Sequence, residues 1–278
     1  MVINCRGHLL SLEHPVLMGI LNTTPDSFYK GSRVVSNEAL LMQAEQMLKA
    51  GATILDIGGA SSRPGAAAVS TEEELRRVLP AVEVLRAHFP AAILSVDTYS
   101  AKVAQAAFDT GAHLLNDISG GSLDQDLLQV VAAAKAPYVL MHMQGTPRTM
   151  QANPQYGDLM TTIADFFMDK IGQLQTLGVQ DILLDVGFGF GKTIAHNYEL
   201  LANLAAFKTL NCPLLVGISR KSMIWKLLEN TPEEALNGTT ALHMVALQQG
   251  AKILRVHDVQ AANEVLTLWE QLGSPITG

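Results

Sequence analysis

The chain has 278 residues, of which 48% are hydrophobic and 16% are charged, and its formal net charge is −7. This length suits one barrel-sized domain, the low charge content argues against long disordered tails, and the acidic balance argues against a nucleic-acid partner. The chain has two cysteines, no signal-peptide core at its N-terminus and no apolar run of about 20 residues, so a soluble, cytoplasmic protein with no membrane partner is expected.

Eight short apolar runs recur along the chain, and most of them end in polar residues. They cover residues 16–22, 52–59, 91–98, 113–119, 137–144, 182–187, 213–219 and 252–258. Runs of this kind are typical of strands that are buried on both faces of a parallel sheet. The sequence therefore predicts eight strands.

Helical patterns lie between these runs, at residues 38–50, 71–89, 101–110, 127–134, 158–177, 197–207 and 259–272. Thr71 and Glu74 have the spacing of a capping box, which predicts that Thr71 caps its helix. Thr231 followed by Pro232 predicts another helix, with Thr231 as the N-cap and the proline at the first helical position.

Eight strand-and-helix units in one chain predict a single (β/α)8 TIM barrel domain over residues 1–278. An open, doubly wound sheet uses similar elements and is the second possibility, because eight is the number of units that closes a barrel. Two long loops follow the first two predicted strands, at roughly residues 23–36 and 60–70. Loops of this length in a compact domain are usually functional, and we expect both to be mobile.

Polar residues gather at the carboxyl ends of the predicted strands, which open on one face of a barrel and form its active site. They are Asn22, Ser61, Ser62, Arg63, Asp97, Asn116, Asp117, His142, Asp185, Ser219, Arg220, Lys221, Arg255 and His257. Some of them must be structural. We expect Asp117 and Asp258 to cap helices or to pair with Arg220, and His142 is equally consistent with a wall histidine and with a site residue.

The chemistry of this set points to an anionic substrate that carries a flat heterocycle. Four basic residues create a local positive field that suits a phosphorylated group: Arg63, Lys221, Arg255 and His257. Asp97 and Asp185 need N–H donors in an apolar pocket, and the edge of a pterin or guanine supplies an N–H beside an NH₂. Asn116 both donates and accepts, so it suits the mixed edge of the same ring.

The glycine-rich run GFGFGK, residues 187–192, matches neither a phosphate-binding P-loop nor a dinucleotide fingerprint. A phosphate cradle is therefore only weakly supported here. Phe188 and Phe190 can belong to the core or can form an apolar wall for an aromatic ligand.

Eight sequence blocks point to a family. GILNTTPDSF, DIGGASSRPGA, SVDT, NDIS, MHMQGTP, DVGFGFGK, GISRKS and RVHD occur in this order. Together they resemble the bacterial dihydropteroate synthases, from about residue 15 to residue 260. The resemblance implies a TIM barrel, usually a homodimer, that condenses 6-hydroxymethyl-7,8-dihydropterin pyrophosphate with p-aminobenzoate in folate synthesis and is the target of sulfonamides. It also implies Mg²⁺ as the cofactor.

The resemblance assigns roles to particular residues. The pterin would be held by Asp97, Asn116, Asp185 and Lys221. The pyrophosphate would be held by Asn22, Ser62, Arg63, Arg255 and His257, with Asn22 as the metal ligand. The p-aminobenzoate would be framed by Ser62, Pro64, Phe190, Lys221 and Ser222. The catalytic residues would be Arg63, Lys221, Arg255 and His257. We expect an SN1-like displacement, because an electron-rich dihydropterin can stabilise the cation that forms when pyrophosphate leaves.

The chain departs from many relatives after PDSF, where it reads Tyr29, Lys30, Gly31 and Ser32, and also at Ala60, Ser62 and Val186. In the first loop, only Asn22 and Asp26 are therefore assigned. One alternative is a methyltetrahydrofolate:corrinoid methyltransferase, which would need neither SSRPGA nor RVHD. The other is a non-catalytic pterin-binding paralogue, which would be expected to lose one of the four basic residues, and all four are present.

Overall fold

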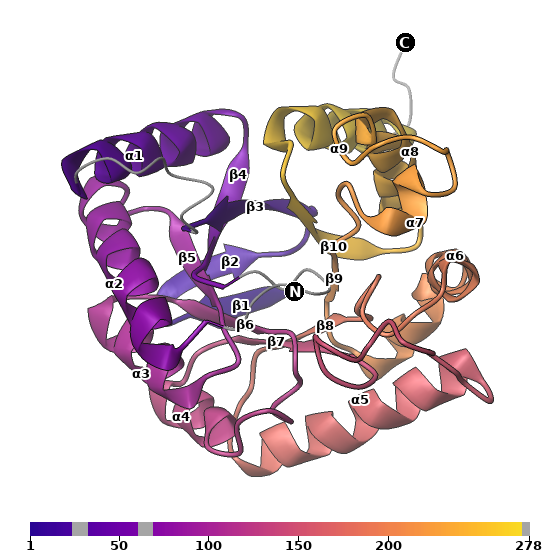
Figure 1. Cartoon of the computed structure of the whole chain (residues 1–278), viewed down its shortest axis with the longest axis horizontal. Coiled ribbons are helices and arrows are strands. Elements are labelled where there is room, and N and C mark those ends of the chain that lie inside the picture. Colours follow the sequence, from indigo (N-terminus) through magenta and orange to yellow (C-terminus); the bar gives the residue numbers. More distant parts are fainter. Residues whose placement is uncertain (24–32, 61–68, 274–278) are drawn as a thin grey trace.

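The computed structural model describes residues 1–23, 33–60 and 69–273. Its centre is a closed barrel of parallel strands in chain order, from β3 to β10, with β10 paired to β3 (Figure 1). The strands are β3 Val16–Asn22, β4 Ala52–Gly58, β5 Ile93–Asp97, β6 Leu114–Asp117, β7 Tyr138–Met141, β8 Ile182–Asp185, β9 Leu214–Val216 and β10 Ala251–Val256. The pairing of β10 with β3 confirms the TIM barrel and excludes the open sheet.

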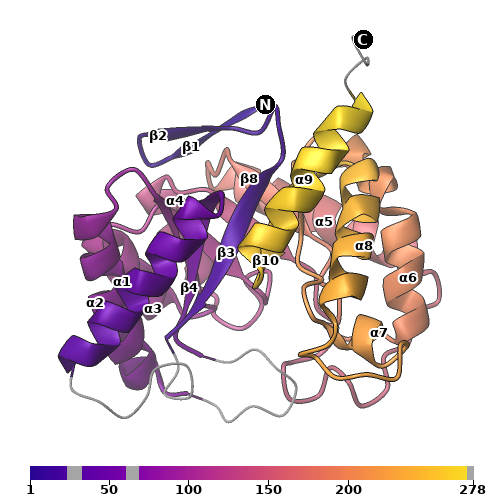
Figure 2. The same ribbon diagram turned by 90° about the horizontal axis from the view of Figure 1, so that it is seen from above.

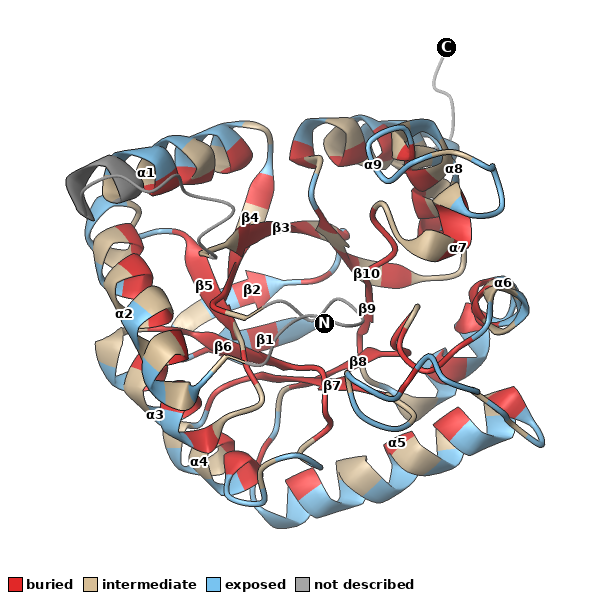
Figure 3. Cartoon of the chain, viewed as in Figure 1, coloured by how far each residue is buried: buried red, intermediate tan, exposed pale blue. Residues whose placement is uncertain are grey.

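Helices surround the barrel (Figure 1). They are α1 Arg33–Lys49, α2 Thr71–His88, α3 Ala101–Thr110, α4 Leu127–Ala134, α5 Leu159–Thr176, α6 Ile194–Ala202, α7 Ser222–Trp225, α8 Leu236–Gln248 and α9 Val259–Gly273, with a 3-10 segment, η1, at Leu204–Leu210. Figure 3 shows buried residues along the strands and on the inner sides of the helices, and exposed residues on the outer sides. Among the described helices, none has the length and apolar character to cross a membrane.

A hairpin that we did not predict precedes the barrel. Strands β1 Val2–Cys5 and β2 His8–Ser11 pair antiparallel around a turn in which Arg6 and Gly7 have positive φ. Figure 2 shows the hairpin across the end of the barrel where β3 begins. Its inward side chains, Ile3, Cys5 and Leu10, pack in one buried cluster with the first layer of barrel residues, and so seal this end with apolar contacts.

Two predicted helix starts are wrong. In each, a group that would have formed a hydrogen bond within the helix binds a residue from another segment instead. The cap of α2 is Ser70, whose Oγ accepts from Glu73 N at 3.2 Å, and not Thr71. Glu74 bonds to Thr98 in the buried interior, so it does not reach back as a capping-box partner. The expected second half of the capping box is therefore missing.

The helix predicted from Thr231 and Pro232 begins instead at Leu236. The Arg220 guanidinium donates to the carbonyl oxygens of Pro232 at 2.8 Å and Glu233 at 2.6 Å. In a helix these oxygens would accept from backbone N–H groups four residues later. The contact with Arg220 keeps residues 232–235 in a turn.

Other boundaries moved as well. The helix predicted at 197–207 is divided between α6 and η1 at Asn203, and α1 begins at Arg33, inside the first predicted loop. Residues 24–32 and 61–68 of the two predicted loops lie outside the described residues. The predicted mobility of these loops therefore stays a prediction.

Candidate active site at the carboxyl ends of the strands

Side chains from five strands meet inside the barrel near its carboxyl end. They are Asp56 on β4, Ser95 and Asp97 on β5, Asn116 on β6, Asp185 on β8 and Arg255 on β10. Strand pairing brings them close, since Asp97 is the register partner of both Gly58 and Asn116. Four of the predicted residues, Asp97, Asn116, Asp185 and Arg255, therefore share one polar layer.

Arg255 lies between two carboxylates. Its Nε donates to Asp56 Oδ2 at 2.6 Å, and its Nη2 donates to Asp97 Oδ2 at 2.7 Å. Burial lowers the pKa of Arg255, but Asp56 and Asp97 more than offset that effect and raise it above its usual value. Burial raises the pKa of Asp97 to about 7, although Arg255 acts in the opposite direction. The guanidinium is thus permanently charged and fixed in place by two contacts.

Asp56 is a site residue that the sequence analysis missed. Its side chain is fully buried and accepts from Ser95 Oγ at 2.6 Å, from Asn116 Nδ2 at 3.0 Å and from Arg255. It therefore fixes both the amide of Asn116 and the guanidinium of Arg255. The available signal was a carboxylate inside an apolar strand, since a buried charge needs partners.

Asp185 and Lys221 are two further charged groups at this end of the barrel, and each shifts the pKa of the other. Burial raises the pKa of Asp185, and Lys221, the Gly187 N–H at 2.8 Å and Arg255 act against this rise. Burial lowers the pKa of Lys221 to about 8, while Asp185 raises it. Lys221 Nζ lies 4.7 Å from the centroid of the Phe190 ring and donates to Phe188 O. This cation–π contact brings together two residues that we predicted to frame the arylamine.

The glycine-rich loop packs closely against the segment that follows β7. A Cβ at Gly187 would lie 2.0 Å from His142 O, and a Cβ at Gly191 would lie 2.6 Å from Gln144 O. Both glycines have positive φ, at 71° and 65°. Glycine is required here because two backbones touch and the chain turns left-handed, which gives no support to a phosphate cradle.

Asp117 and His142, whose roles were open, have structural contacts. Asp117 accepts from the backbone N–H groups of Ser119 and Gly121, both at 2.7 Å, and from Tyr138 Oη at 2.6 Å. Burial and the charge of Lys192 lower the pKa of His142 to about 3, so this wall histidine is neutral at physiological pH.

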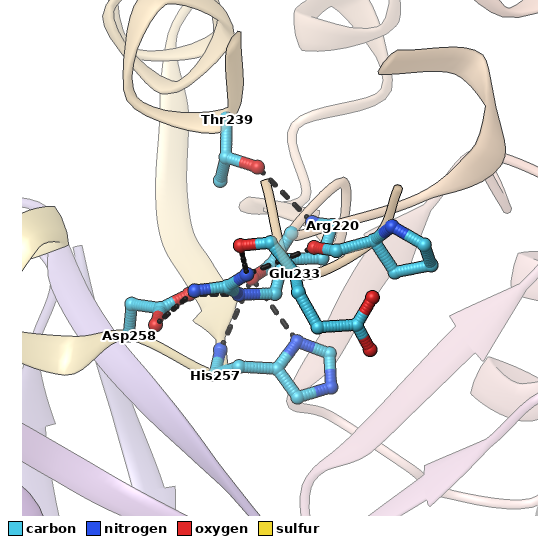
Figure 4. Close-up of polar contacts among 7 residues, drawn as sticks. Arg220, Glu233, Thr239, His257 and Asp258 are labelled. Atoms are coloured by element: carbon cyan, nitrogen blue, oxygen red, sulfur yellow. Dashed lines mark hydrogen bonds and ion pairs between the residues drawn. The ribbon is translucent and has the colours of Figure 1, made fainter. Parts of the chain in front are cut away.

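Arg220 ties three loops together at the end of β10 (Figure 4). It binds Asp258 through two contacts, Nε to Oδ2 at 2.7 Å and Nη2 to Oδ1 at 2.9 Å, which is one of the two roles that the sequence left open for Asp258. Ser219 Oγ accepts from His257 N at 3.2 Å and lies 3.1 Å from His257 Nδ1, so the exposed imidazole has a defined orientation. His257 and Arg255 both extend from the end of β10.

The remaining predicted residues are placed only in part. Asn22 ends β3 and Ser222 begins α7, both half-buried, while Ser62, Arg63 and Pro64 lie outside the described residues. In the described part of the chain, no group of three or more His, Cys, Asp or Glu residues is arranged to hold a metal ion.

An apolar cluster lies beside the polar layer. Its buried members are Ile118, Met141, Met150 and Phe190, and Tyr99 and Met143 pack against them. The aromatic Phe190, which was open between core and wall, lies in this cluster with 8% of its surface exposed, whereas Phe188 is fully buried in the main core. Phe190 can therefore present part of its ring to a ligand.

Comparison with known proteins identifies the family of the chain. Residues 18–257 match the pterin binding enzyme family. The chain is 47% identical over 267 residues to the dihydropteroate synthase of Escherichia coli K12, covering 95% of this chain and 94% of that protein. It is 43% identical over 272 residues to the Haemophilus influenzae dihydropteroate synthase, covering 97% and 98%.

Solved structures give the same result. The Yersinia pestis dihydropteroate synthase in a sulfonamide drug complex matches with a TM-score of 0.93 and 46% identity, covering 99% of this chain and 100% of that one. The Xanthomonas albilineans dihydropteroate synthase with 4-aminobenzoic acid matches with a TM-score of 0.91 and 41% identity, covering 99% and 98%. The chain belongs to the pterin binding enzyme family and, within it, to the dihydropteroate synthases.

Proposed function

We propose that this protein condenses 6-hydroxymethyl-7,8-dihydropterin pyrophosphate with p-aminobenzoate to give 7,8-dihydropteroate and pyrophosphate. The observation that carries this proposal is the buried polar layer of Asp97, Asn116 and Asp185 beside Arg255, directly next to the Lys221–Phe190 contact. The first group suits a pterin edge, and the second suits an aromatic amine that carries a carboxylate.

Pterin recognition follows from the state of the carboxylates. Asp185 is buried with its pKa raised, so it gains from new N–H donors that replace lost water. The adjacent N–H and NH₂ of the pterin supply two parallel donors, as an Arg fork does. Asn116 is held by Asp56 through its Nδ2, which leaves its Oδ1 to face a ligand donor. The ring would then lie flat between the polar layer and the apolar cluster.

The charge balance of the layer supports a magnesium ion at the pyrophosphate. The described centre contains the carboxylates of Asp56, Asp97 and Asp185 and the cations of Lys192, Lys221 and Arg255, so it is close to neutral. A pyrophosphate brings several negative charges and needs further cations. Mg²⁺ is usually bound by few protein oxygens together with substrate phosphates and water, which fits Asn22 as its protein ligand. The bound ion would neutralise charge on the leaving group.

We propose a dissociative order of bond changes. The bond between the pterin CH₂ and the pyrophosphate oxygen breaks first, the oxygen keeps the electron pair, and the dihydropterin ring stabilises the cation. Arg255, His257 and the predicted Arg63 stabilise the departing charge. The amine nitrogen then forms the new C–N bond and loses a proton. This order needs no strong general base, and the neutral His142 is not placed as one.

The test is pyrophosphate release by the purified chain, measured with and without p-aminobenzoate and with and without Mg²⁺. We expect turnover that depends on the arylamine and on Mg²⁺, together with a slow release without arylamine. Absence of arylamine-dependent turnover would contradict the function. Release that strictly requires the arylamine would contradict only the dissociative order.

The alternative functions fit the site less well. The presence of Arg255 and His257 at the mouth favours the synthase over a corrinoid methyltransferase, which needs no such anion site. It also disfavours a non-catalytic paralogue. From the family resemblance we further propose a homodimer that binds sulfonamides in place of p-aminobenzoate. Light scattering and competition against p-aminobenzoate would test these two points.

A further inference from the structure

The loop that carries Phe190 is held by side chains at four of its carbonyl groups. Four consecutive backbone oxygens each accept from a different side chain: Phe188 O from Lys221 Nζ, Gly189 O from Gln151 Nε2, Phe190 O from Lys192 Nζ and Gly191 O from Tyr156 Oη. The Gly189 N–H also donates to Asn197 Oδ1 at 2.7 Å. A segment with three glycines would lose much conformational entropy on ordering, and these contacts offset that loss.

Lys192 is the most buried of the donors, with 2% of its surface exposed. Its Nζ lies 3.0 Å from Phe190 O, 3.0 Å from His142 Nδ1 and 3.3 Å from His142 O. An ammonium group has three N–H donors, and here all three have an acceptor. His142 is neutral, so its Nδ1 can accept this bond. Lys192 thereby joins the backbone of Phe190 to the end of β7.

Burying a lysine to hold a loop costs free energy, because its ammonium group loses water. Burial lowers the pKa of Lys192 to about 7, and Asp185 raises it while Lys221 lowers it. All three of its hydrogen-bond acceptors are uncharged, so no direct ion pair with a described residue offsets the desolvation. The Phe190 ring, whose centroid lies 4.7 Å from Lys221 Nζ, is carried by the loop that Lys192 holds.

We propose that Lys192 is a positioning residue for the arylamine subsite. It holds Phe190 O and so sets the apolar wall against which the aromatic ring of p-aminobenzoate lies. The hydrogen bonds that fix Asp97, Asn116 and Arg255 in the pterin layer come from Asp56 and from one another and do not involve Lys192. Lys192 acts on this layer through its charge alone, which opposes the burial that raises the pKa of Asp185. The inference rests on the proposed function and adds a residue that acts on one of the two substrates.

The experiment compares the KM for each substrate in variants of the full chain. Lys192→Met removes all three donors, and we expect the KM for p-aminobenzoate to rise about tenfold or more. The KM for the pterin substrate should rise by a clearly smaller factor, because this substrate is affected only by the loss of the Lys192 charge near Asp185. Lys192→Arg keeps the charge and the donors and should recover most of the loss. Tyr156→Phe removes the neighbouring contact to Gly191 O and should raise the same KM by a smaller factor. Lys102→Met, an exposed lysine on α3, is the matched control and should change neither value.

Several results would overturn the proposal: equal increases in both KM values, no change in either, or identical behaviour of the Met and Arg variants. If Lys192→Met does not fold, Lys192→Gln keeps two amide donors, and the same split between the two KM values is required of it. A wild-type chain without arylamine-dependent turnover would contradict the proposed function itself. An active wild type whose Lys192 variants show no split would contradict only the role of Lys192.

Discussion

The two ends of the barrel interior differ in chemistry although the same strands build both. Five strands change from an apolar to a polar inward residue over two positions: Ile54 and Asp56 on β4, Ile93 and Ser95 on β5, Leu114 and Asn116 on β6, Leu183 and Asp185 on β8, and Ile253 and Arg255 on β10. Successive inward side chains lie two residues apart along a strand, so these pairs are neighbouring layers. One layer faces the sealing hairpin, and the next faces the site.

This difference separates stability from chemistry. The apolar layer and the hairpin bury hydrophobic area, which favours folding. The polar layer buries carboxylates whose pKa values are raised at Asp97 and Asp185, which means that folding disfavours their charged forms. The site is therefore held together by the rest of the barrel. Replacements in the polar layer should lower activity with little loss of stability, and replacements in the apolar layer should lower stability with little loss of activity.

The largest effect is expected from Asp185→Asn. Loss of the carboxylate removes a charged acceptor for the pterin edge, and we expect kcat/KM for the pterin substrate to fall roughly 100- to 1,000-fold. Stability should stay the same or increase, since the folded state no longer holds a carboxylate with a raised pKa. Steady-state kinetics and urea unfolding check both parts. A large loss of stability with little loss of activity would contradict the separation.

Leu183→Ala is the matched change one layer away on the same strand. Leu183 is fully buried, and its truncation should lower the free energy of unfolding by about 2–5 kcal/mol. We expect kcat/KM to remain within about twofold of wild type at temperatures where the variant is folded, because the polar layer keeps its own hydrogen bonds. A fall in kcat/KM comparable to that of Asp185→Asn would show that the layers are not independent.

Low pH should decrease the stability of the folded chain through His113 at the hairpin end of the barrel. His113 follows α3 and packs on His8, with ring centroids 4.5 Å apart. Burial, with the neighbouring His8, Arg86 and Arg6, lowers the pKa of His113 from 6.5 to about 4. As the pH falls from 6.5 towards 4, the unfolded chain binds this proton first, so stability decreases.

His113→Asn should therefore lose less stability than wild type between pH 7.5 and pH 4.5, by on the order of 2 kcal/mol. The carboxyls of Asp97 and Asp185 have raised pKa values and contribute the opposite slope, so only the difference between variant and wild type isolates His113. Urea unfolding at both pH values measures it, with the exposed His88→Asn as the control. Parallel curves for His113→Asn and wild type would contradict the assignment.

The smallest effect is expected from Ser219→Ala. This change removes the hydroxyl that contacts both His257 N and His257 Nδ1 but leaves the Arg220–Asp258 pair intact. The imidazole should be held less firmly, and the KM for the pterin pyrophosphate should rise about 3- to 10-fold. The affinity for a pterin without phosphates should not change. A loss of affinity for both ligands would place His257 at the pterin and not at the anion.

The barrel could be predicted from the sequence because buried parallel strands read as apolar runs. Residues 16–22 were predicted and found as β3, and the other barrel strands lie within or beside their predicted runs. Most of the polar layer could be predicted for the same reason, since Asp97 and Asp185 end their strands and Asn116 is the last residue but one of β6. The β1–β2 hairpin was not visible, because four-residue strands with alternate burial give little pattern.

The rest depended on partners that are distant in sequence. Asp56 bonds to Arg255 across 199 positions, and Lys192 bonds to His142 across 50. The start of α8 was moved by Arg220, which lies 12 positions before Pro232. In each case the local sequence is compatible with more than one conformation or side-chain role, and a contact with a distant residue determines which one the folded chain adopts. Prediction failed at positions where one side chain binds several segments.

The most direct test of the account is titration calorimetry of 6-hydroxymethylpterin, which carries the heterocycle without phosphates, into wild type and Asp185→Asn. We expect wild type to bind this ligand and the variant to lose about 100-fold or more in affinity. Equal affinity in both proteins, or no binding to wild type, would contradict the claim that the polar layer at the carboxyl end recognises the pterin.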